Sequence, residues 1–331
     1  MSEMFDRIFE LPAQLRHPVD RVAVRGTEGP IVMLGMGGSG MAAAVAALGV
    51  TDPGRIVAVH RSYGLPAWAG AARATIVAVS YSGNTEETVS GVVEALELGL
   101  TVVAVTSGGR IAALAEREGL PLVEVPAGLQ PRAAVGYQVA AATTALEGLG
   151  AVDDLGALEE GARVLDELLG DGSGPAVTLG RDLAEAMEGR VPAIYGGFPV
   201  GGLAAYRWKT QINENTKRPA WSSEVPELDH NELQGWDAAG DLRDVVGVVH
   251  LRDAHDHPRV VRRFELMEAA LRDEVPHLGT VHSQGDGPVA RFFSLAVVGD
   301  VASVVAAEAL GVDPEPVPLL EDFKRRLKES E

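Results

Sequence analysis

Residues 31–50 read IVMLGMGGSGMAAAVAALGV and carry no charged side chain over twenty positions. A helix of that length could cross a lipid bilayer. The stretch is interrupted, however, by Gly35, Gly37, Gly38 and Gly40, and glycine weakens a helix interior. An apolar run, then glycines, then alanines are typical of a buried strand, a tight turn and a buried helix. We therefore expect a strand–turn–helix unit here and no membrane span.

The same alternation continues toward the C-terminus through the first half of the chain. Short β-branched runs recur between helical segments, at RIVAVH (55–60), TIVAVS (75–80), TVVAVT (101–106) and PLVEV (121–125). Nearly continuous apolar strands separated by helices indicate a mainly parallel sheet with helices on both faces. Five strands by residue 125 complete one open, doubly wound α/β domain.

The second half repeats this pattern more loosely. Strands are expected at VPAIYGG (191–197), VVGVVHL (245–251) and HLGTVHS (277–283), with a helix through Arg207 and a long apolar helix over 288–310. The strand–glycine–helix pattern at 31 recurs near 194, which suggests an internal duplication of roughly 160 residues. We predict two doubly wound domains, 1–150 and 151–331, because an acidic, glycine-rich segment follows residue 150.

Composition limits the kinds of partner. The chain has 331 residues, which fits about two domains of roughly 150 residues each. Its net charge of −19 disfavours nucleic acid and anionic membranes as partners. With no cysteine it has neither disulfides nor thiolate chemistry, which fits a cytoplasmic location. The first twenty residues predict a surface helix, and Leu319, Leu320, Phe323 and Leu327 predict an amphipathic one at the C-terminus.

The glycine turn after the first strand is a candidate phosphate site. Gly35, Gly37 and Gly40 have the G-x-G-x-x-G spacing that lets the backbone approach a phosphate at a helix N-terminus. A dinucleotide site normally has an acidic residue at the end of the next strand, where this chain has His60 and Arg61. Because Arg61 could bind a 2′-phosphate, an NADP-dependent oxidoreductase is one hypothesis.

A second polar loop, SYSGNTEET (80–88), follows another strand and begins another helix. Alone it could be a helix cap formed by Ser82 or Asn84. Because the carboxyl ends of parallel strands converge, the two loops together predict a binding site for one phosphate group. Its candidate residues are Gly38, Ser39, Ser80, Ser82 and Thr85.

Five segments together resemble the bifunctional phosphoglucose/phosphomannose isomerase family, whose chains contain two sugar isomerase (SIS) domains. They are GMGGSGMA (35–42), SYSGNTEET (80–88), PRAAVGY (131–137), NENTKRPAW (213–221) and ELDHNELQGW (227–236). They lie in both halves and occur in the family's order. The resemblance implies two SIS-type domains and an isomerase that converts glucose 6-phosphate or mannose 6-phosphate to fructose 6-phosphate without a cofactor.

The resemblance also assigns catalytic roles that single residues would not suggest. By itself Glu214 is a carboxylate at the end of a predicted helix, and Arg132 is a cation after the fifth strand. The resemblance implies that Glu214 is the catalytic base and that Arg132 stabilises an enediolate. It implies that His230 opens the sugar ring from the partner subunit of a homodimer. It also places a catalytic lysine in the terminal helix. We assign this lysine to Lys324, although adjacent basic residues leave open which position of the helix corresponds to it.

Two further hypotheses remain beside the isomerase. One is the NADP-dependent oxidoreductase, and the other is a non-catalytic phosphosugar-binding protein. A metal site at His255, Asp256 and His257 is disfavoured, because three consecutive residues cannot all face one ion. No G-x-S-x-G nucleophile motif is present. We expect no metal and no nicotinamide, hexose 6-phosphates as substrates, and neither nucleic acid nor membrane as a partner.

Overall fold

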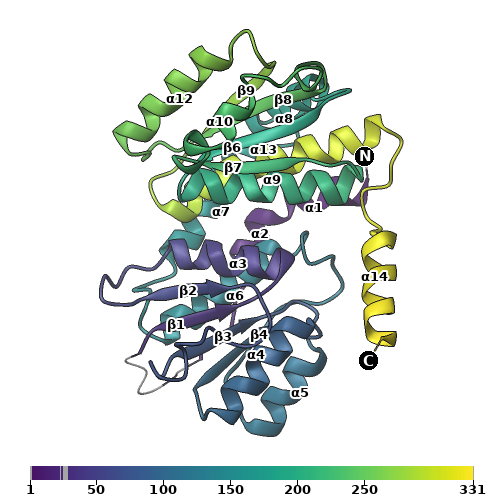
Figure 1. Ribbon diagram of the computed structural model, residues 1–331. Helices are drawn as coiled ribbons and strands as arrows, with labels where there is room; N and C mark the ends of the chain where they lie inside the picture. Colours follow the sequence, from purple (N-terminus) through teal and green to yellow (C-terminus); the bar gives the residue numbers. More distant parts are fainter. Residues whose placement is uncertain (1, 23, 25–28, 331) are drawn as a thin grey trace. The chain divides into compact units, whose positions relative to one another are not determined.

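The computed structural model describes residues 2–22, 24 and 29–330. The chain divides into two compact units, and Figure 1 labels most of their helices and strands. The N-terminal unit comprises Phe9–Asp171 and His282–Leu295, and the C-terminal unit comprises Met1–Ile8, Gly172–Val281 and Ala296–Glu331. Each unit contains one sheet, and the two sheets take their strands from opposite sides of residue 150.

The N-terminal unit is built on a five-stranded parallel sheet. Its strand order is β2-β1-β3-β4-β5, and every neighbouring pair is parallel. The five runs predicted from the sequence are these strands, so the α/β prediction is confirmed. Their bounds are β1 Ile31–Leu34, β2 Val57–His60, β3 Thr75–Val79, β4 Val102–Thr106 and β5 Leu122–Glu124.

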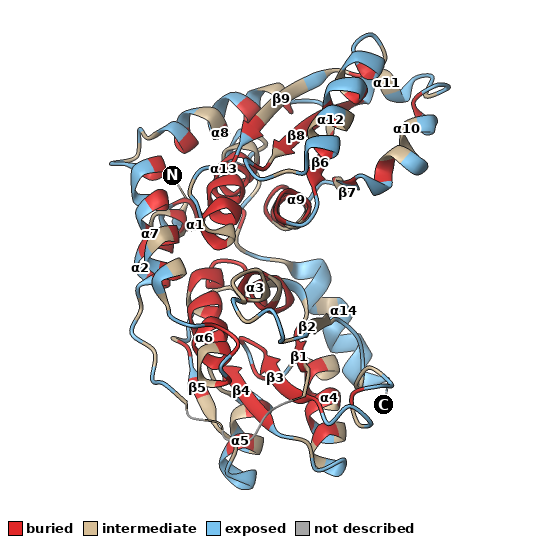
Figure 2. Ribbon diagram, turned by 90° about the vertical axis from the view of Figure 1, so that its left-hand side faces the viewer, coloured by how far each residue is buried: buried red, intermediate tan, exposed pale blue. Residues whose placement is uncertain are grey.

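Helices cover both faces of this sheet. The unit contains α2 (Leu11–Leu15), α3 (Gly37–Leu48), α4 (Glu86–Glu97), α5 (Gly109–Glu118), α6 (Val135–Gly148) and α7 (Gly156–Leu169). Successive strand residues point to opposite faces. Ile31 and Met33 of β1 pack with α3 and α6, whereas Val32 and Leu34 pack with α4. Figure 2 shows β1, β3 and β4 buried along their length, as their apolar residues require, whereas the edge strands β2 and β5 are only partly buried.

The C-terminal unit has a four-stranded sheet in the order β7-β6-β8-β9. The central strand β6 is parallel to both of its neighbours. The three predicted strands correspond to β6 (Val191–Gly197), β8 (Val246–Arg252) and β9 (His277–His282). Strand β7 (Trp221–Val225) was not predicted, because the preceding Pro219 and its polar neighbours are typical of a loop.

Helices complete this unit. They are α1 (Glu3–Phe9), α8 (Pro175–Ala186), α9 (Val200–Thr216), the 3-10 turn η1 (Glu227–His230), α10 (Glu232–Gly235), α11 (Leu242–Val245), α12 (Pro258–Leu271) and α14 (Pro318–Glu329). Helix α13 (Pro288–Ala309) contributes residues to both units. Helix α9 continues nine residues beyond Arg207, where the predicted helix ended. The predicted C-terminal amphipathic helix is confirmed as α14.

The burial of side chains tests what was expected of residues 31–50 and of the N-terminus. Residues 31–50 form β1 and α3, as expected for a strand–turn–helix unit. The N-terminus forms two short helices, α1 and α2, in place of one, and they lie on the surface with Glu3 and Asp6 exposed and with Met4, Phe5 and Ile8 buried. Among the described helices, only α13 is long and apolar enough to cross a membrane, and 89% of its apolar window is buried inside the protein. That is the pattern of a core helix.

His250 on β8 is a buried titratable side chain in the C-terminal unit. It is 1% exposed, and its Nδ1 lies 3.1 Å from Oε1 of Glu268. Its ring also stands 4.8 Å from that of His277, centroid to centroid. Burial lowers the pKa of His250 to about 4, although the contact with Glu268 opposes the shift. The imidazole is therefore neutral at neutral pH.

This burial predicts how stability depends on pH. In the unfolded chain His250 binds a proton near its ordinary pKa of about 6.5, whereas the folded protein excludes that proton until about pH 4. Between these values the unfolded state holds more protons, so the free energy of unfolding falls as pH falls. In His250→Phe that free energy should fall less than in the wild type from pH 6.5 to 4, by up to about 3 kcal/mol. Urea titrations at each pH measure the difference.

The control is His255→Phe, since His255 lies on an exposed loop. This variant should keep the wild-type pH dependence. Identical pH dependence in His250→Phe and the wild type would contradict the prediction.

Candidate functional site

The first part of the site is the glycine turn between β1 and α3. Met36 precedes α3 in an extended conformation and its side chain makes no cap hydrogen bond. The first helical hydrogen bond runs from the Gly40 N–H to the Met36 carbonyl, at 3.0 Å. The N–H groups of the first turn are thus without a side-chain cap. Such an N-terminus carries a partial positive charge and can bind an anion.

The loop between β3 and α4 has the same feature. Thr85 precedes α4 in an extended conformation and also makes no side-chain cap hydrogen bond. The alternative in which Ser82 or Asn84 caps this helix is therefore wrong. The hydroxyl of Ser80 donates to that of Thr85 at 3.0 Å, and the exposed Ser82 accepts from the Asn84 N–H at 3.2 Å. Their hydroxyls lie beside a second helix N-terminus that is open to a ligand.

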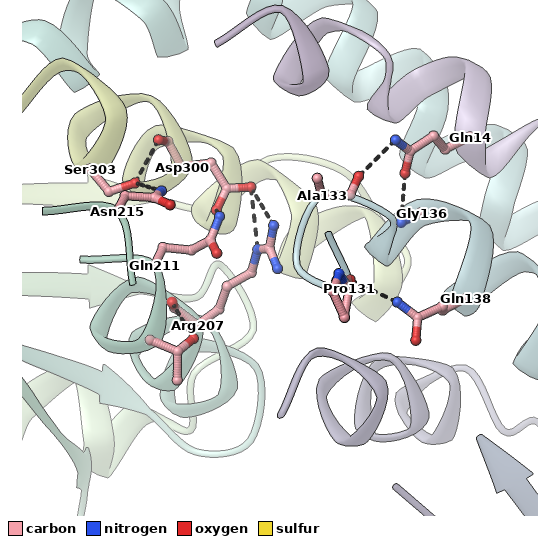
Figure 3. Close-up of polar contacts among 11 residues, drawn as sticks. Gln14, Pro131, Ala133, Gly136, Gln138, Arg207, Gln211, Asn215, Asp300 and Ser303 are labelled. Carbon is pink, nitrogen blue, oxygen red and sulfur yellow. Dashed lines mark hydrogen bonds and ion pairs between the residues drawn. The ribbon is translucent and has the colours of Figure 1, made fainter. Parts of the chain in front are cut away.

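Ser39 joins these two loops. Its hydroxyl accepts from the Tyr81 N–H at 3.0 Å and donates to Oε1 of Gln138 at 2.6 Å. Gln138 in turn donates from Nε2 to the Pro131 carbonyl at 2.8 Å, as Figure 3 shows. A hydroxyl has only one proton to donate. In this arrangement Ser39 uses it to connect protein segments, and a direct contact of Ser39 with phosphate stays a prediction.

Arg132 lies in the same unit, next to the glycine turn. A Cβ placed on Gly38 would come within 3.0 Å of the Pro131 carbonyl oxygen and 3.3 Å of the Arg132 nitrogen. A side chain at this position would need the Pro131–Arg132 backbone to shift by a few tenths of an ångström, so glycine favours this close approach. Arg132 itself is 4% exposed. The structure thus brings Arg132, the glycine turn and the Ser80–Thr85 loop together at the carboxyl ends of the parallel strands.

Two buried glutamines that hold the Arg132 segment were not found from the sequence. Gln14 of α2 donates to the Ala133 carbonyl at 2.8 Å and accepts from the Gly136 N–H at 3.1 Å (Figure 3). Gln138 follows the PRAAVGY segment directly. The one indication in the sequence was that each glutamine interrupts an apolar helical pattern. A polar side chain at such a position is expected to be buried and hydrogen-bonded, but the pattern does not name its partner.

Glu214 lies in the C-terminal unit, in the last turn of α9, and is half-buried. The position matches the prediction of a carboxylate near a helix end. The next residues terminate the helix, because Lys217 adopts a left-handed conformation with φ of +59°. The Lys217 ammonium donates to the carbonyls of Glu214, at 2.6 Å, and Pro314, at 3.1 Å.

A buried polar network fixes the helix that carries Glu214. Arg207, Gln211 and Asn215 follow at four-residue spacing along one face of α9. Arg207 pairs with Asp300 at 2.7 Å, Gln211 donates to Asp300 at 3.1 Å, and Asn215 donates to Ser303 at 2.9 Å (Figure 3). Both charged side chains of the ion pair are at most 4% exposed. The network sets the rotation of α9 and therefore the direction of Glu214.

The other two predicted catalytic residues also belong to the C-terminal unit. His230 is exposed at the end of η1 and lines an open hollow of about 570 Å³. Lys324 is exposed on α14, which Figure 2 shows exposed along its length. Next to it, Arg325 pairs with Glu329 and Arg326 pairs with Asp322. Glu214, His230 and Lys324 thus lie on three separate elements of this unit.

The segment 255–257 forms a loop before α12. His257 accepts from the Arg259 N–H at 3.1 Å and so caps the helix. Asp256 is half-buried, and burial raises its pKa to about 6. Within the described ranges, no three His, Asp or Glu side chains are grouped in a way that could hold a metal ion.

The network under α9 predicts a large effect for one substitution. Asp300→Ala removes the carboxylate that binds Arg207 and Gln211, and breaking a buried ion pair typically destabilises by about 3–5 kcal/mol. Urea unfolding of the whole chain should show a loss of this size. Glu167→Ala is the control, since its pair with Arg163 is exposed and such pairs contribute at most about 1 kcal/mol. Similar losses in the two variants would contradict this account of α9.

Comparison with known proteins finds a matching family and a similar fold. Residues 176–327 match the bacterial phospho-glucose isomerase C-terminal SIS domain. The chain is also similar to a glucose-6-phosphate isomerase like protein of known structure from Thermus thermophilus, with a TM-score of 0.58 at 17% identity, covering 98% of this chain and 96% of that one. At that identity the likeness concerns the fold alone.

Sequence relatives extend the match to nearly the whole chain. The bifunctional phosphoglucose/phosphomannose isomerase of Caldicellulosiruptor bescii is 32% identical, and the match covers 98% of this chain and 99% of the relative. The enzyme of the same name from Aquifex aeolicus is 35% identical, and the match covers 90% of each chain. The chain therefore belongs to the bifunctional phosphoglucose/phosphomannose isomerase family.

Proposed function

We propose that this protein interconverts glucose 6-phosphate or mannose 6-phosphate with fructose 6-phosphate. The observation that carries the proposal is the pair of uncapped helix N-termini, of which that of α3 lies against the Arg132 backbone. These N–H groups, together with the hydroxyls of Ser82 and Thr85, suit a phosphate dianion. The buried Ser80 donates its hydroxyl proton to Thr85, so its direct contact with phosphate stays a prediction, as for Ser39. A protein of net charge −19 needs such local polarity, because its overall field repels anions.

The proposed reaction moves one proton between neighbouring carbons. Glu214 takes the proton from C2 of the open-chain aldose, which leaves an enediol, and returns it to C1. The aldehyde carbon is thereby reduced and C2 is oxidised, so the substrate needs no external hydride acceptor and the enzyme is an intramolecular oxidoreductase. Glucose 6-phosphate and mannose 6-phosphate differ only at C2 and give the same enediol, so one base can serve both if the intermediate rotates about C2–C3.

The remaining groups have supporting roles in this proposal. Arg132 stabilises the negative charge that develops on the enediolate oxygens, as a fixed cation does in a water-poor site. His230 exchanges protons with the ring oxygen during opening, since imidazole titrates nearest to neutral pH. Lys324 is assigned as the catalytic lysine that the family has in its terminal helix. These roles rest on the family's motifs.

We also propose that the enzyme is a homodimer in which His230 acts across the interface. Helix α14 supports an association of this kind, because Leu319, Leu320, Phe323 and Leu327 on its surface are 40–81% exposed. An exposed apolar helix face is typical of a protein interface. Sedimentation, and recovery of activity on mixing inactive Glu214→Gln and His230→Ala chains, test the arrangement.

The phosphate site predicts a selective loss of affinity in Ser82→Ala. Ser82 is exposed, so removing its hydroxyl should leave folding nearly unchanged. A hydrogen bond to a charged group contributes about 1.5–3 kcal/mol, so the Kd for fructose 6-phosphate should rise at least about tenfold. Calorimetric titration measures it.

Ser90→Ala is the matched control on the same helix, because its hydroxyl donates to the Glu87 carbonyl one turn beyond the N-terminus. It should bind fructose 6-phosphate as the wild type does. Unchanged affinity in Ser82→Ala would remove this hydroxyl from the phosphate site.

The proposed base predicts the behaviour of Glu214→Gln. Glutamine keeps the shape of the side chain but cannot accept the proton, so turnover should fall by at least about 10²-fold while substrate still binds. In deuterated water the wild type should incorporate solvent label at C2 of the aldose, and the variant should lose this exchange together with turnover. A coupled assay with the three hexose 6-phosphates and mass spectrometry provide the two readouts.

Glu188→Gln on the exposed surface is the control and should keep wild-type activity. Chelator should leave the wild type active. Near-normal turnover by Glu214→Gln would disprove the assignment of the base. A wild type that binds sugar phosphates without isomerising them would favour the non-catalytic phosphosugar-binding protein, and one that oxidises them with NADP would favour the oxidoreductase.

A further inference from the structure

The carboxylate of Glu232 binds the segment that carries His230 to the sheet. Oε1 of Glu232 accepts from the hydroxyl of Tyr195 at 2.6 Å and from the indole N–H of Trp221 at 3.0 Å. Oε2 accepts from the hydroxyl of Ser223. Three donors from two strands therefore converge on a side chain two residues from His230. We call this group of four residues the Glu232 clamp.

The donors of the clamp are themselves fixed by the sheet. Tyr195 of β6 and Ser223 of β7 are register partners in neighbouring parallel strands, and Trp221 lies two residues before Ser223 on the same face. Tyr195 is fully buried, and its hydroxyl also accepts from the indole of Trp236 at 3.1 Å. Burial, and secondarily the charge of Glu232, raises the pKa of Tyr195 far above its usual range. Its hydroxyl therefore stays protonated and available as a donor.

The residues on both sides of His230 are tied down. Asp229 forms an ion pair of 3.0 Å with Arg263 of α12, and Leu228 is buried in the core. The Asn231 side chain accepts from the Glu232 N–H at 2.6 Å and begins α10. His230 itself is exposed, and its side chain makes no hydrogen bond among the residues that the structure describes. This arrangement fixes the backbone of η1 while leaving the imidazole available to a ligand.

From these contacts we propose that Glu232 is a positioning residue for His230, acting through its hydrogen bonds to Tyr195, Trp221 and Ser223. The proposal rests on the proposed function, in which His230 opens the sugar ring. Glu232 does not contact the substrate in this proposal, because its carboxylate bonds to the sheet. These bonds hold the backbone at His230 in the position from which the imidazole reaches the ring oxygen. A misplacement of about 1 Å can reduce a rate about 10²-fold.

Glu232→Ala is the disruptive variant and Glu232→Gln the conservative one. The glutamine carbonyl can accept from Tyr195 and Trp221, and its amide can donate to the Ser223 hydroxyl, so the clamp can form without the charge. Glu232→Ala should lower kcat for hexose 6-phosphate isomerisation by about 10- to 100-fold, with KM within about threefold of the wild type. Glu232→Gln should recover most of this loss. A glutamine variant as impaired as the alanine one would overturn a role that acts through hydrogen bonds.

A double-mutant cycle separates positioning from an independent role. If Glu232 acts through His230, then His230→Ala and His230→Ala/Glu232→Ala should have the same residual activity, because the second change has nothing left to misplace. Losses that multiply in the double variant would overturn the inference. Asp237→Ala is the matched control, as an exposed carboxylate in the same segment with a single 3.4 Å contact, and it should keep wild-type kcat.

Tryptophan fluorescence tests the clamp without relying on activity. Trp221 bonds directly to Glu232 and Trp236 bonds to Tyr195, so Glu232→Ala should shift their emission to longer wavelength, while His230→Ala should not. Ser223→Ala removes one donor only and should give a smaller change in the same direction, which covers the case in which Glu232→Ala fails to fold. If the wild type isomerises and Glu232→Ala has normal kcat despite the shifted emission, the inference fails. If the wild type isomerises no hexose 6-phosphate, the proposed function itself fails.

Discussion

One short chain of hydrogen bonds organises the candidate phosphate site. It runs from the Tyr81 N–H to the Ser39 hydroxyl, from that hydroxyl to Gln138, and from Gln138 to the Pro131 carbonyl. Three loops that follow three different strands are thereby held at fixed positions. A parallel sheet brings loops of this kind to one edge, but it does not set their mutual distances. The buried side chains do so, and each is satisfied by the next, as the low polarity of the interior requires.

In the C-terminal unit a buried ion pair fixes the position of the helix that carries Glu214. Arg207 and Asp300 form an ion pair that is almost fully buried, and Gln211 completes the hydrogen bonding of the carboxylate. A buried pair of this kind adds little net stability compared with apolar packing, but a wrong rotation of α9 would leave charges without their partners. We infer that the network is there to specify one register of α9 and hence one direction for Glu214.

Electrostatics in this protein are local. The net charge of −19 would repel a sugar phosphate at long range. Within the candidate site, backbone N–H groups, hydroxyls and a buried arginine provide local attraction for an anion. Oriented dipoles at helix N-termini are suited to this task, because they bind an anion without adding to the charge of the folded protein. The glycine at position 38 has a related purpose, since its missing side chain lets the Arg132 segment approach the helix end.

The sequence alone determined the alternation of strands and helices, the parallel sheet of the N-terminal unit and the loops that follow its strands. These features depend on periodicity and on glycine, which are local properties. The phosphate loops and the position of Glu214 near a helix end were visible for the same reason. The tertiary structure decided which hydroxyls remain open to a ligand, which face of the N-terminal helices is buried and that β7 is a strand. It also revealed the partners of Gln14, Gln138, Arg207 and Glu232. These residues are joined to groups up to 122 positions away, and no local pattern predicts which buried polar side chain will meet which partner once the chain has folded.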